Sequence, residues 1–152
     1  MSDVRTTLLF TIKLGAAPPQ MLGKTPLGDR RIVAVTGGSF EGPKLRGTVE
    51  PGGSDWILAR PDGALLLDVR LSLRTDDGAL IGMSYRGYRH GPPAVIERLN
   101  RGEAVDASEY YFRTAPLFET AAPKYDWLNR IVSIGLGHRP PEGPIYRVFE
   151  VL

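Results

Sequence analysis

Apolar and polar residues alternate through residues 51–89, and two short turn sequences interrupt the alternation. The first turn is Pro61-Asp62-Gly63 and the second is Asp76-Asp77-Gly78. Each turn has two residues that accept the right-handed helical region, followed by a glycine that accepts positive φ without steric cost. Loops of this kind join neighbouring antiparallel strands, so this stretch is predicted to fold as three strands connected by two hairpin turns.

The loop length also fixes which residues face one another across the two hairpins. Arg60 is predicted to lie opposite Ala64, and Thr75 opposite Ala79. Counting inward from these positions gives the remaining pairs, which are Asp55 with Val69, Trp56 with Asp68, Ile57 with Leu67, Val69 with Tyr85, Asp68 with Arg86 and Leu71 with Met83.

Because side chains alternate between faces and opposed residues share one face, the three strands have an apolar face and a mixed face. The apolar face carries Asp55, Ile57, Ala59, Leu65, Leu67, Val69, Leu71, Leu73, Ile81, Met83 and Tyr85. The mixed face carries Ser54, Trp56, Leu58, Asp68, Arg70, Ser72, Arg74, Ser84 and Arg86. We expect the apolar face to form the core, because an inverted sheet would expose about ten aliphatic positions. The inverted sheet, with a polar cavity and a dimer covering the aliphatic face, stays open as the alternative.

Strand-like patterns continue on both sides of this stretch. They predict strands over residues 6–14, 30–40, 44–50, 108–115, 130–138 and 145–152. Three prolines favour a loop over residues 16–28, and residues 117–129 are predicted to be irregular with one helical turn. A short helix is expected over residues 93–101, where a proline occupies the first turn and Gly102 follows the end.

This succession of short strands predicts an all-β domain spanning residues 1–152. About eight or nine strands with one short helix favour an antiparallel β-barrel, with a sandwich as the alternative. Gly37 and Gly38 indicate a bulge where a strand bends around the core. Ser133, Gly135 and Gly137 share one strand face and leave room there for a close neighbour.

Composition narrows the functional classes. The formal charge of +2 and the scattered arginines argue against nucleic acid as a partner. The chain has no cysteine and two histidines, so neither a disulfide nor a cysteine- or histidine-based metal site is expected. Neither a signal-peptide core nor an apolar run of membrane-spanning length is present, which predicts a cytoplasmic protein without a membrane partner.

Five segments resemble the bacterial and fungal family known as domain of unknown function 3237, or uncharacterised protein family 0311. They are GPKLRGTVEPGGSDW (42–56), RPDGALLLDVR (60–70), TDDGALIGMSYRG (75–87), YYFRTAPLFET (110–120) and YDWLN (125–129). The resemblance implies a small β-barrel of lipocalin-like appearance and no assigned activity. The motif residues present here are Asp55, Trp56, Asp68, Arg70, Tyr85, Arg113, Glu119, Trp127 and Asn129.

Asp55 and Tyr85 are the candidate catalytic residues. They occupy one row of the apolar face on either side of Val69, and next-nearest strands lie roughly 10 Å apart, so one small molecule could contact both. A desolvated carboxylate gains a pKa suited to a general base, and a phenol can donate to an oxyanion. The structural alternative is that Asp55 accepts backbone N–H bonds from the preceding turn and Tyr85 is a core aromatic residue.

Seven further residues are candidate ligand-binding groups. They are Trp56, Asp68, Arg70, Arg113, Glu119, Trp127 and Asn129. Trp56, Asp68 and Arg70 would line a cavity only in the inverted sheet; otherwise they lie outside. The other four could bind a ligand through arginine and tryptophan, or belong to a connection that plugs the barrel and satisfies its backbone.

Three functions fit these patterns. The first is an enzyme that transfers protons on an apolar or aromatic carbonyl compound, as an isomerase, cyclase or hydratase, with Asp55 as base, Tyr85 as oxyanion donor and no cofactor. The second is a module that binds a small molecule without catalysis, and the third is a structural protein that forms a homodimer or larger oligomer. Phosphate-binding, nucleophile-elbow and dinucleotide motifs are missing from the sequence, which disfavours ATP, serine-hydrolase and NAD chemistry.

Overall fold

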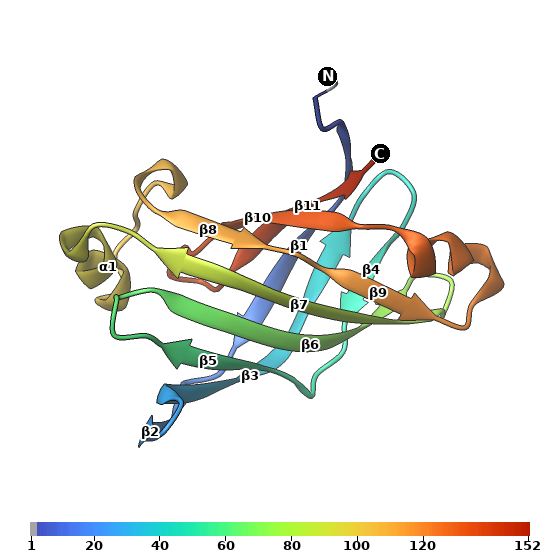
Figure 1. Cartoon of the computed structure of the whole chain (residues 1–152). Coiled ribbons are helices and arrows are strands. Elements are labelled where there is room, and N and C mark those ends of the chain that lie inside the picture. Colours follow the sequence, from blue (N-terminus) through green and yellow to red (C-terminus); the bar gives the residue numbers. More distant parts are fainter. Residues whose placement is uncertain (1–2) are drawn as a thin grey trace.

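The computed structural model describes residues 3–152 and is built mainly of antiparallel strands (Figure 1). The strands are β1 (Thr6–Ala16), β2 (Gln20–Thr25), β3 (Gly28–Glu41), β4 (Arg46–Val49), β5 (Gly53–Ala59), β6 (Leu65–Thr75), β7 (Leu80–His90), β8 (Tyr111–Thr114), β9 (Leu117–Thr120), β10 (Ser133–His138) and β11 (Ile145–Val151). One α-helix, α1 (Pro93–Asn100), and two 3-10 segments, η1 (Ala107–Glu109) and η2 (Pro123–Arg130), complete the described chain.

Eight of the strands close into a barrel. The order around it is β6, β5, β3, β1, β11, β10, β8 and β7, and β7 pairs back onto β6. The other three strands are additions: β4 pairs with β3 and β6 beyond the end of β5, β9 pairs with β7 beyond the end of β8, and β2 pairs with β3 alone. The predicted antiparallel barrel is therefore confirmed.

Two segments predicted to lack regular structure form strands. The expected loop over residues 16–28 contains β2, because its prolines lie before and after Gln20–Thr25 and leave that segment free to pair with β3. The expected irregular connection after Pro116 contains β9, which pairs with Ile81–Ser84 of β7. Each is a short strand at the margin of the barrel, where the sequence offers few residues to display an alternation.

Both hairpin turns have the predicted length and glycine conformation. The N–H of Arg60 donates to the carbonyl of Ala64 at 2.9 Å, and the N–H of Thr75 donates to the carbonyl of Ala79 at 2.9 Å. Gly63 and Gly78 both have φ of +89°, in the region that favours glycine. Asp55 pairs with Val69 and Val69 with Tyr85, as predicted.

The β5–β6 ladder opens between its two ends. Pairing holds at Asp55 and again at Leu58, but the predicted pairs of Trp56 with Asp68 and of Ile57 with Leu67 are missing from the ladder. At this point the N–H of Asp68 donates to Oδ1 of Asp55 at 3.1 Å. The Asp55 carboxylate thus accepts a backbone N–H where the pairing between β5 and β6 is interrupted.

The apolar face of the meander points into the barrel, and the inverted sheet is excluded. Leu67 and Met83 are each 3% exposed, and Val69 is 1% exposed. They join a single core that also receives side chains from β1, β3, β8 and β11. On β10, Gly135 lies against Thr114 and Gly137 against the ring of Phe112, which confirms the close approach predicted for this face.

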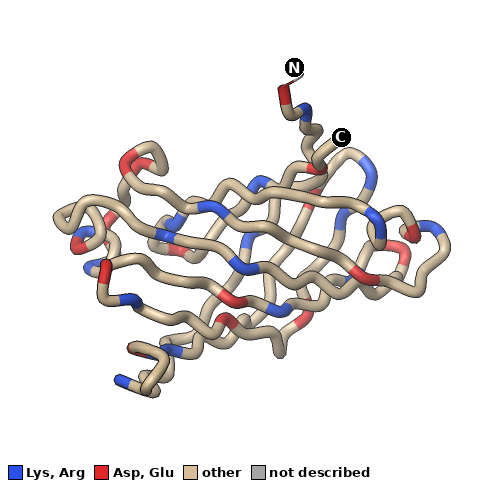
Figure 2. The backbone as a smooth tube through the Cα atoms, viewed as in Figure 1, with Lys and Arg blue, Asp and Glu red and all other residues tan. Residues whose placement is uncertain are grey.

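The two ends of the barrel are covered differently. At one end lies α1, which begins at Pro93 as predicted and ends at Asn100, one residue before the predicted end, and at the other end lies η2 (Figure 1). Tyr125 and Leu128 of η2 are buried in the core. Figure 2 shows basic and acidic residues interspersed along the backbone. Within residues 3–152, none of the helices is long and apolar enough to cross a bilayer.

Candidate functional site

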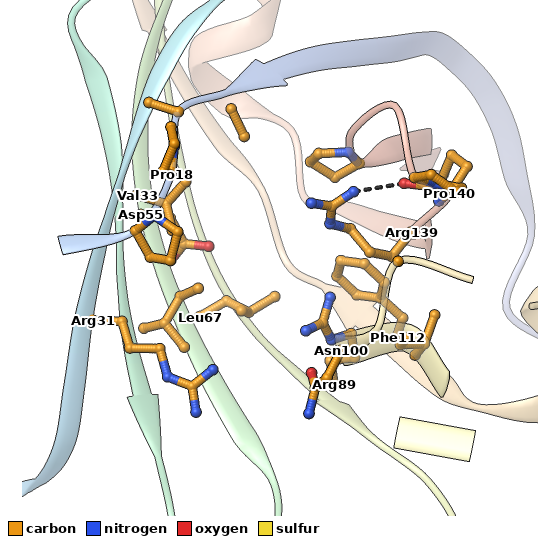
Figure 3. Close-up of a pocket in the computed structure, with 18 of the residues that line it drawn as sticks. Pro18, Arg31, Val33, Asp55, Leu67, Arg89, Asn100, Phe112, Arg139 and Pro140 are labelled. Atoms are coloured by element: carbon orange, nitrogen blue, oxygen red, sulfur yellow. Dashed lines mark hydrogen bonds between the residues drawn. The ribbon is translucent and has the colours of Figure 1, made fainter. Parts of the chain in front are cut away.

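A cavity of about 560 Å³ opens at the α1 end of the barrel, and Figure 3 shows the side chains that line it. Its walls come from β3, β5, β6, β7, β8 and β11, and its rim comes from α1 and two proline-rich connections. The apolar lining includes Val33, Ile57, Leu67, Leu99 and Phe112. The volume lies within the range of small-molecule sites.

Asp55 is the acidic group on the β5 wall. Its carboxylate is turned toward the cavity in Figure 3, while Oδ1 accepts the N–H of Asp68. Burial raises the pKa of Asp55 from 3.8 to about 7, although the Asp68 N–H bond and the charge of Arg89 act in the opposite direction. A carboxyl group with this pKa exchanges protons readily near neutral pH.

Three guanidinium groups line the same cavity. Arg31 projects from β3, on the same wall as Asp55, and Arg89 of β7 and Arg139, which follows β10, lie on the wall opposite (Figure 3). Arg89 lies 5.7 Å from the ring centroid of Phe112. Burial and then the neighbouring charge of Arg139 lower the pKa of Arg89. Asp55 therefore shares the cavity with three half-buried arginine side chains.

Tyr85 lies in the predicted row but does not line the cavity. It is 3% exposed, and its ring packs edge-on against Tyr146 of β11, with centroids 5.3 Å apart. Tyr146 does line the cavity. Burial raises the pKa of both phenols, and the charge of Asp55 adds to the rise in each. The cavity that contains Asp55 is thus also lined by the phenol of Tyr146, against which the buried ring of Tyr85 packs.

The predicted residues of the mixed face lie outside the barrel. Trp56 is 46% exposed, and its carbonyl accepts from Arg30. Asp68 and Arg70 are exposed as well, and Arg70 lines a shallow outer groove together with Glu119. The structure does not bring Trp56, Asp68 and Arg70 to the cavity, because strand alternation turns them away from the side that carries Asp55. Glu119 lies on β9 and does not line the cavity either.

The remaining candidates lie on the outer surface or at the η2 end. Arg113 stacks over Tyr111 and donates to the carbonyl of Phe112. Trp127 packs on the core beneath Lys44, and Asn129 holds both the N–H and the carbonyl of Thr120. The environment of Trp127 and Asn129 is that of the plug described as the alternative for this connection, and their role toward a ligand stays a prediction.

Sequence reasoning did not identify four of the polar residues in the cavity, namely Arg31, Arg89, Arg139 and Tyr146. Strand alternation could have found Arg89, because it lies four residues after Tyr85 on the same face of β7. The same argument applies to Tyr146, two residues before buried Val148. Arg139 lies in a connection after β10, where alternation gives no information.

The arrangement suits proton transfer. Asp55 can take or give a proton, while Arg89 and Tyr146 can stabilise negative charge on an oxygen atom nearby. Residues 3–152 contain no cluster of three or more histidine, cysteine, aspartate or glutamate side chains arranged to bind a metal ion.

Fold and cavity together define a small antiparallel β-barrel with a ligand-sized cavity at its α1 end. The chain belongs to the family described as protein of unknown function (DUF3237), whose sequence profile matches residues 4–151. The UPF0311 protein of Clostridium acetobutylicum is 35% identical over 144 residues, covering 94% of this chain and 91% of that protein. The solved structure of a conserved protein of unknown function from Rhodopseudomonas palustris matches with a TM-score of 0.96 at 34% identity, over 100% of both chains.

A more distant relative is named as an enzyme. The hydroalkoxylation enzyme phnH of Penicillium herquei is 27% identical over 127 residues, covering 84% of this chain and 70% of that enzyme. The solved structure of an enzyme from the same fungus has a TM-score of 0.76 at 22% identity, covers 100% of this chain and 97% of its own, and shares the fold.

Proposed function

We propose that this protein is an enzyme that moves protons on a small carbonyl compound bound in the cavity, with Asp55 as the proton carrier. The observation that carries the proposal is the position of Asp55, a partly buried carboxylate at the wall of a largely apolar cavity, where burial raises its pKa to about 7. Perturbed acids in cavities are common at catalytic sites. A non-catalytic binding module would use the same cavity, so a measurement of turnover is needed to distinguish it from an enzyme.

The simplest reaction is an isomerisation. The Asp55 carboxylate takes a proton from the carbon next to the carbonyl group, and the electron pair of the broken C–H bond forms the enolate. Arg89 and Tyr146 stabilise the enolate oxygen, and the proton on Asp55 is returned to another atom of the same molecule. Atoms and charge balance without a second reactant.

The relative named for hydroalkoxylation supports a closely related step. In that reaction an O–H group adds across a carbon–carbon double bond, so a proton must leave oxygen and reach carbon. Asp55 could take the proton as the oxygen adds to an unsaturated carbonyl compound, and then return it to the carbon of the resulting enolate. A cyclisation or hydration of this kind uses the same groups as the isomerisation.

Proton exchange with solvent tests the proposal without knowledge of the natural substrate. The protein is incubated in D₂O with keto acids and enones, beginning with phenylpyruvate, and proton NMR follows the loss of the signal next to the carbonyl. Wild-type protein should accelerate exchange for at least one compound that binds. Asp55→Asn should reduce that acceleration at least about 100-fold, the usual contribution of a general acid or base, with binding retained.

The matched control is Asp76→Asn, which removes one carboxylate from an exposed ion pair with Arg46 at a hairpin turn. It should leave exchange unchanged. Undiminished exchange by Asp55→Asn, or no exchange for any compound that binds, would contradict catalysis by Asp55 and favour the binding module.

A further inference from the structure

The three guanidinium groups of the cavity have no ionic partner of their own. Nine ion pairs connect charged side chains within residues 3–152, and neither Arg31, Arg89 nor Arg139 belongs to any of them. The Nε atoms of Arg31 and Arg89 are buried and lack a hydrogen-bond partner. Arg139 donates to the carbonyl of Pro140, a neutral acceptor.

Acidic residues at the cavity do not balance these charges. Glu103 lies at the rim, but its carboxylate pairs with Arg98 and Arg101. Asp55 remains, and burial keeps it partly protonated near neutral pH. The cavity therefore holds three cations against at most one anion, and less than one when Asp55 carries its proton.

A buried guanidinium without a carboxylate or phosphate is costly, because nothing replaces the water it has lost. We propose that the ligand of this cavity is an organic anion, whose carboxylate or acidic enol oxygen accepts hydrogen bonds from Arg89 and Arg139 while Arg31 contributes charge from the wall opposite. This inference rests on the proposed function for the location of the site, and it adds the charge of the substrate.

The walls select an organic monoanion over inorganic phosphate. Val33, Ile57, Leu67, Leu99 and Phe112 offer apolar surface that a bare phosphate cannot use. The carboxylate of Asp55 would also repel a dianion at close range. A ligand with a carboxylate on an aromatic or branched apolar body would contact both the arginines and the apolar walls. Arg89 lies over the ring of Phe112, so the carboxylate could bind Arg89 while the apolar body packs against Phe112.

Matched pairs of probes test the inference by titration calorimetry on the full chain. One pair is benzoate and benzamide, and the other is phenylpyruvate and its methyl ester. Each anion should bind about tenfold or more tightly than its neutral partner, in keeping with charge-assisted hydrogen bonds. Equal or tighter binding of the neutral partners, or no binding of either anion, would overturn the inference.

Arg89→Met separates ligand binding from a structural role. If Arg89 binds the anionic ligand, the Arg89→Met substitution should weaken anion binding about tenfold or more. The ligand-free variant should be equally or more stable than wild type, because an unpaired buried charge has been removed. A role within the core predicts the reverse, a lower stability with unchanged preference for anions. Arg139→Gln provides a second variant, and Arg147→Met, on the exposed face of β11, is the control that should change neither property.

The outcomes for this inference and for the proposed function are distinguishable. Anion binding retained in Asp55→Asn, with exchange lost, supports both. Anion binding without any exchange in wild-type protein supports the inference and contradicts catalysis. Exchange that depends on Asp55 but occurs equally with the neutral ester overturns the inference alone.

Discussion

At the scale of single residues, Asp55 links the stability of the protein to pH. Its pKa is about 7 when folded, against 3.8 for an ordinary aspartate, so between these values the folded state binds the proton more tightly than the unfolded state. The free energy of unfolding should therefore fall as pH rises from about 4 to about 7. Below that window this contribution is fully present, and above it the contribution is lost.

Asp55→Asn should remove this dependence, because the amide has no proton to lose and its oxygen can still accept the N–H of Asp68. Relative to wild type, we expect the variant to gain about 1–2 kcal/mol between pH 5 and pH 8, with solvent at the cavity mouth reducing the full effect of the shift. Urea unfolding of both proteins at the two pH values measures it, with Asp76→Asn as control. If the difference in free energy of unfolding between the two proteins is the same at both pH values, folding does not raise the pKa of Asp55.

The sequence identified Asp55 because one carboxylate interrupts an apolar face whose register two turns define. It did not identify the arginines, because their meeting depends on how distant strands close the barrel. Arg31 and Asp55 share a wall only after β3 pairs with β5, and Arg139 reaches the cavity from a connection. Alternation along one strand predicts which face of the sheet a residue lies on. The residues that it contacts on that face depend on how the strands close into the barrel.

At the scale of elements, β10 positions the wall of the cavity because residue 137 is a glycine, which leaves room for the ring of Phe112. A Cβ added at Gly137 would lie 2.5 Å from Cγ of Phe112, and the ring of Phe112 lines the cavity. Because Cγ lies close to the backbone, the ring cannot avoid the new methyl group by a small rotation alone. The glycine is therefore a packing requirement of the site as well as of the sheet.

Gly137→Ala should force the Phe112 ring from its place and destabilise the protein by about 1–3 kcal/mol, the usual cost of overpacking. Anion affinity should fall in the same variant, because Phe112 and Arg89 pack together. Chemical denaturation and calorimetry measure the two effects. A double-mutant cycle with Phe112→Leu is the control: the smaller side chain should recover part of the lost stability, and strictly additive costs would show that the two residues do not interfere.

At the scale of the whole molecule, the two ends of the barrel differ in how they are packed. The η2 end is filled: Leu128 is 0% exposed, and Tyr125 donates from its hydroxyl group to Asp77 at 3.0 Å. The α1 end retains the cavity. Trp127, which packs on the core, and Asn129, which holds the backbone of Thr120, also lie at the filled end.

Two leucines test this division, because they carry the same side chain at opposite ends. Leu128→Ala and Leu67→Ala should each lower the free energy of unfolding by about 2–5 kcal/mol, with Leu67 at the lower limit because it already borders a cavity. Only Leu67→Ala should change the affinity for benzoate or phenylpyruvate at a temperature where both variants are folded, since only Leu67 touches the site. A change of equal size in Leu128→Ala would mean that packing at the filled end reaches the cavity through the core that both leucines share.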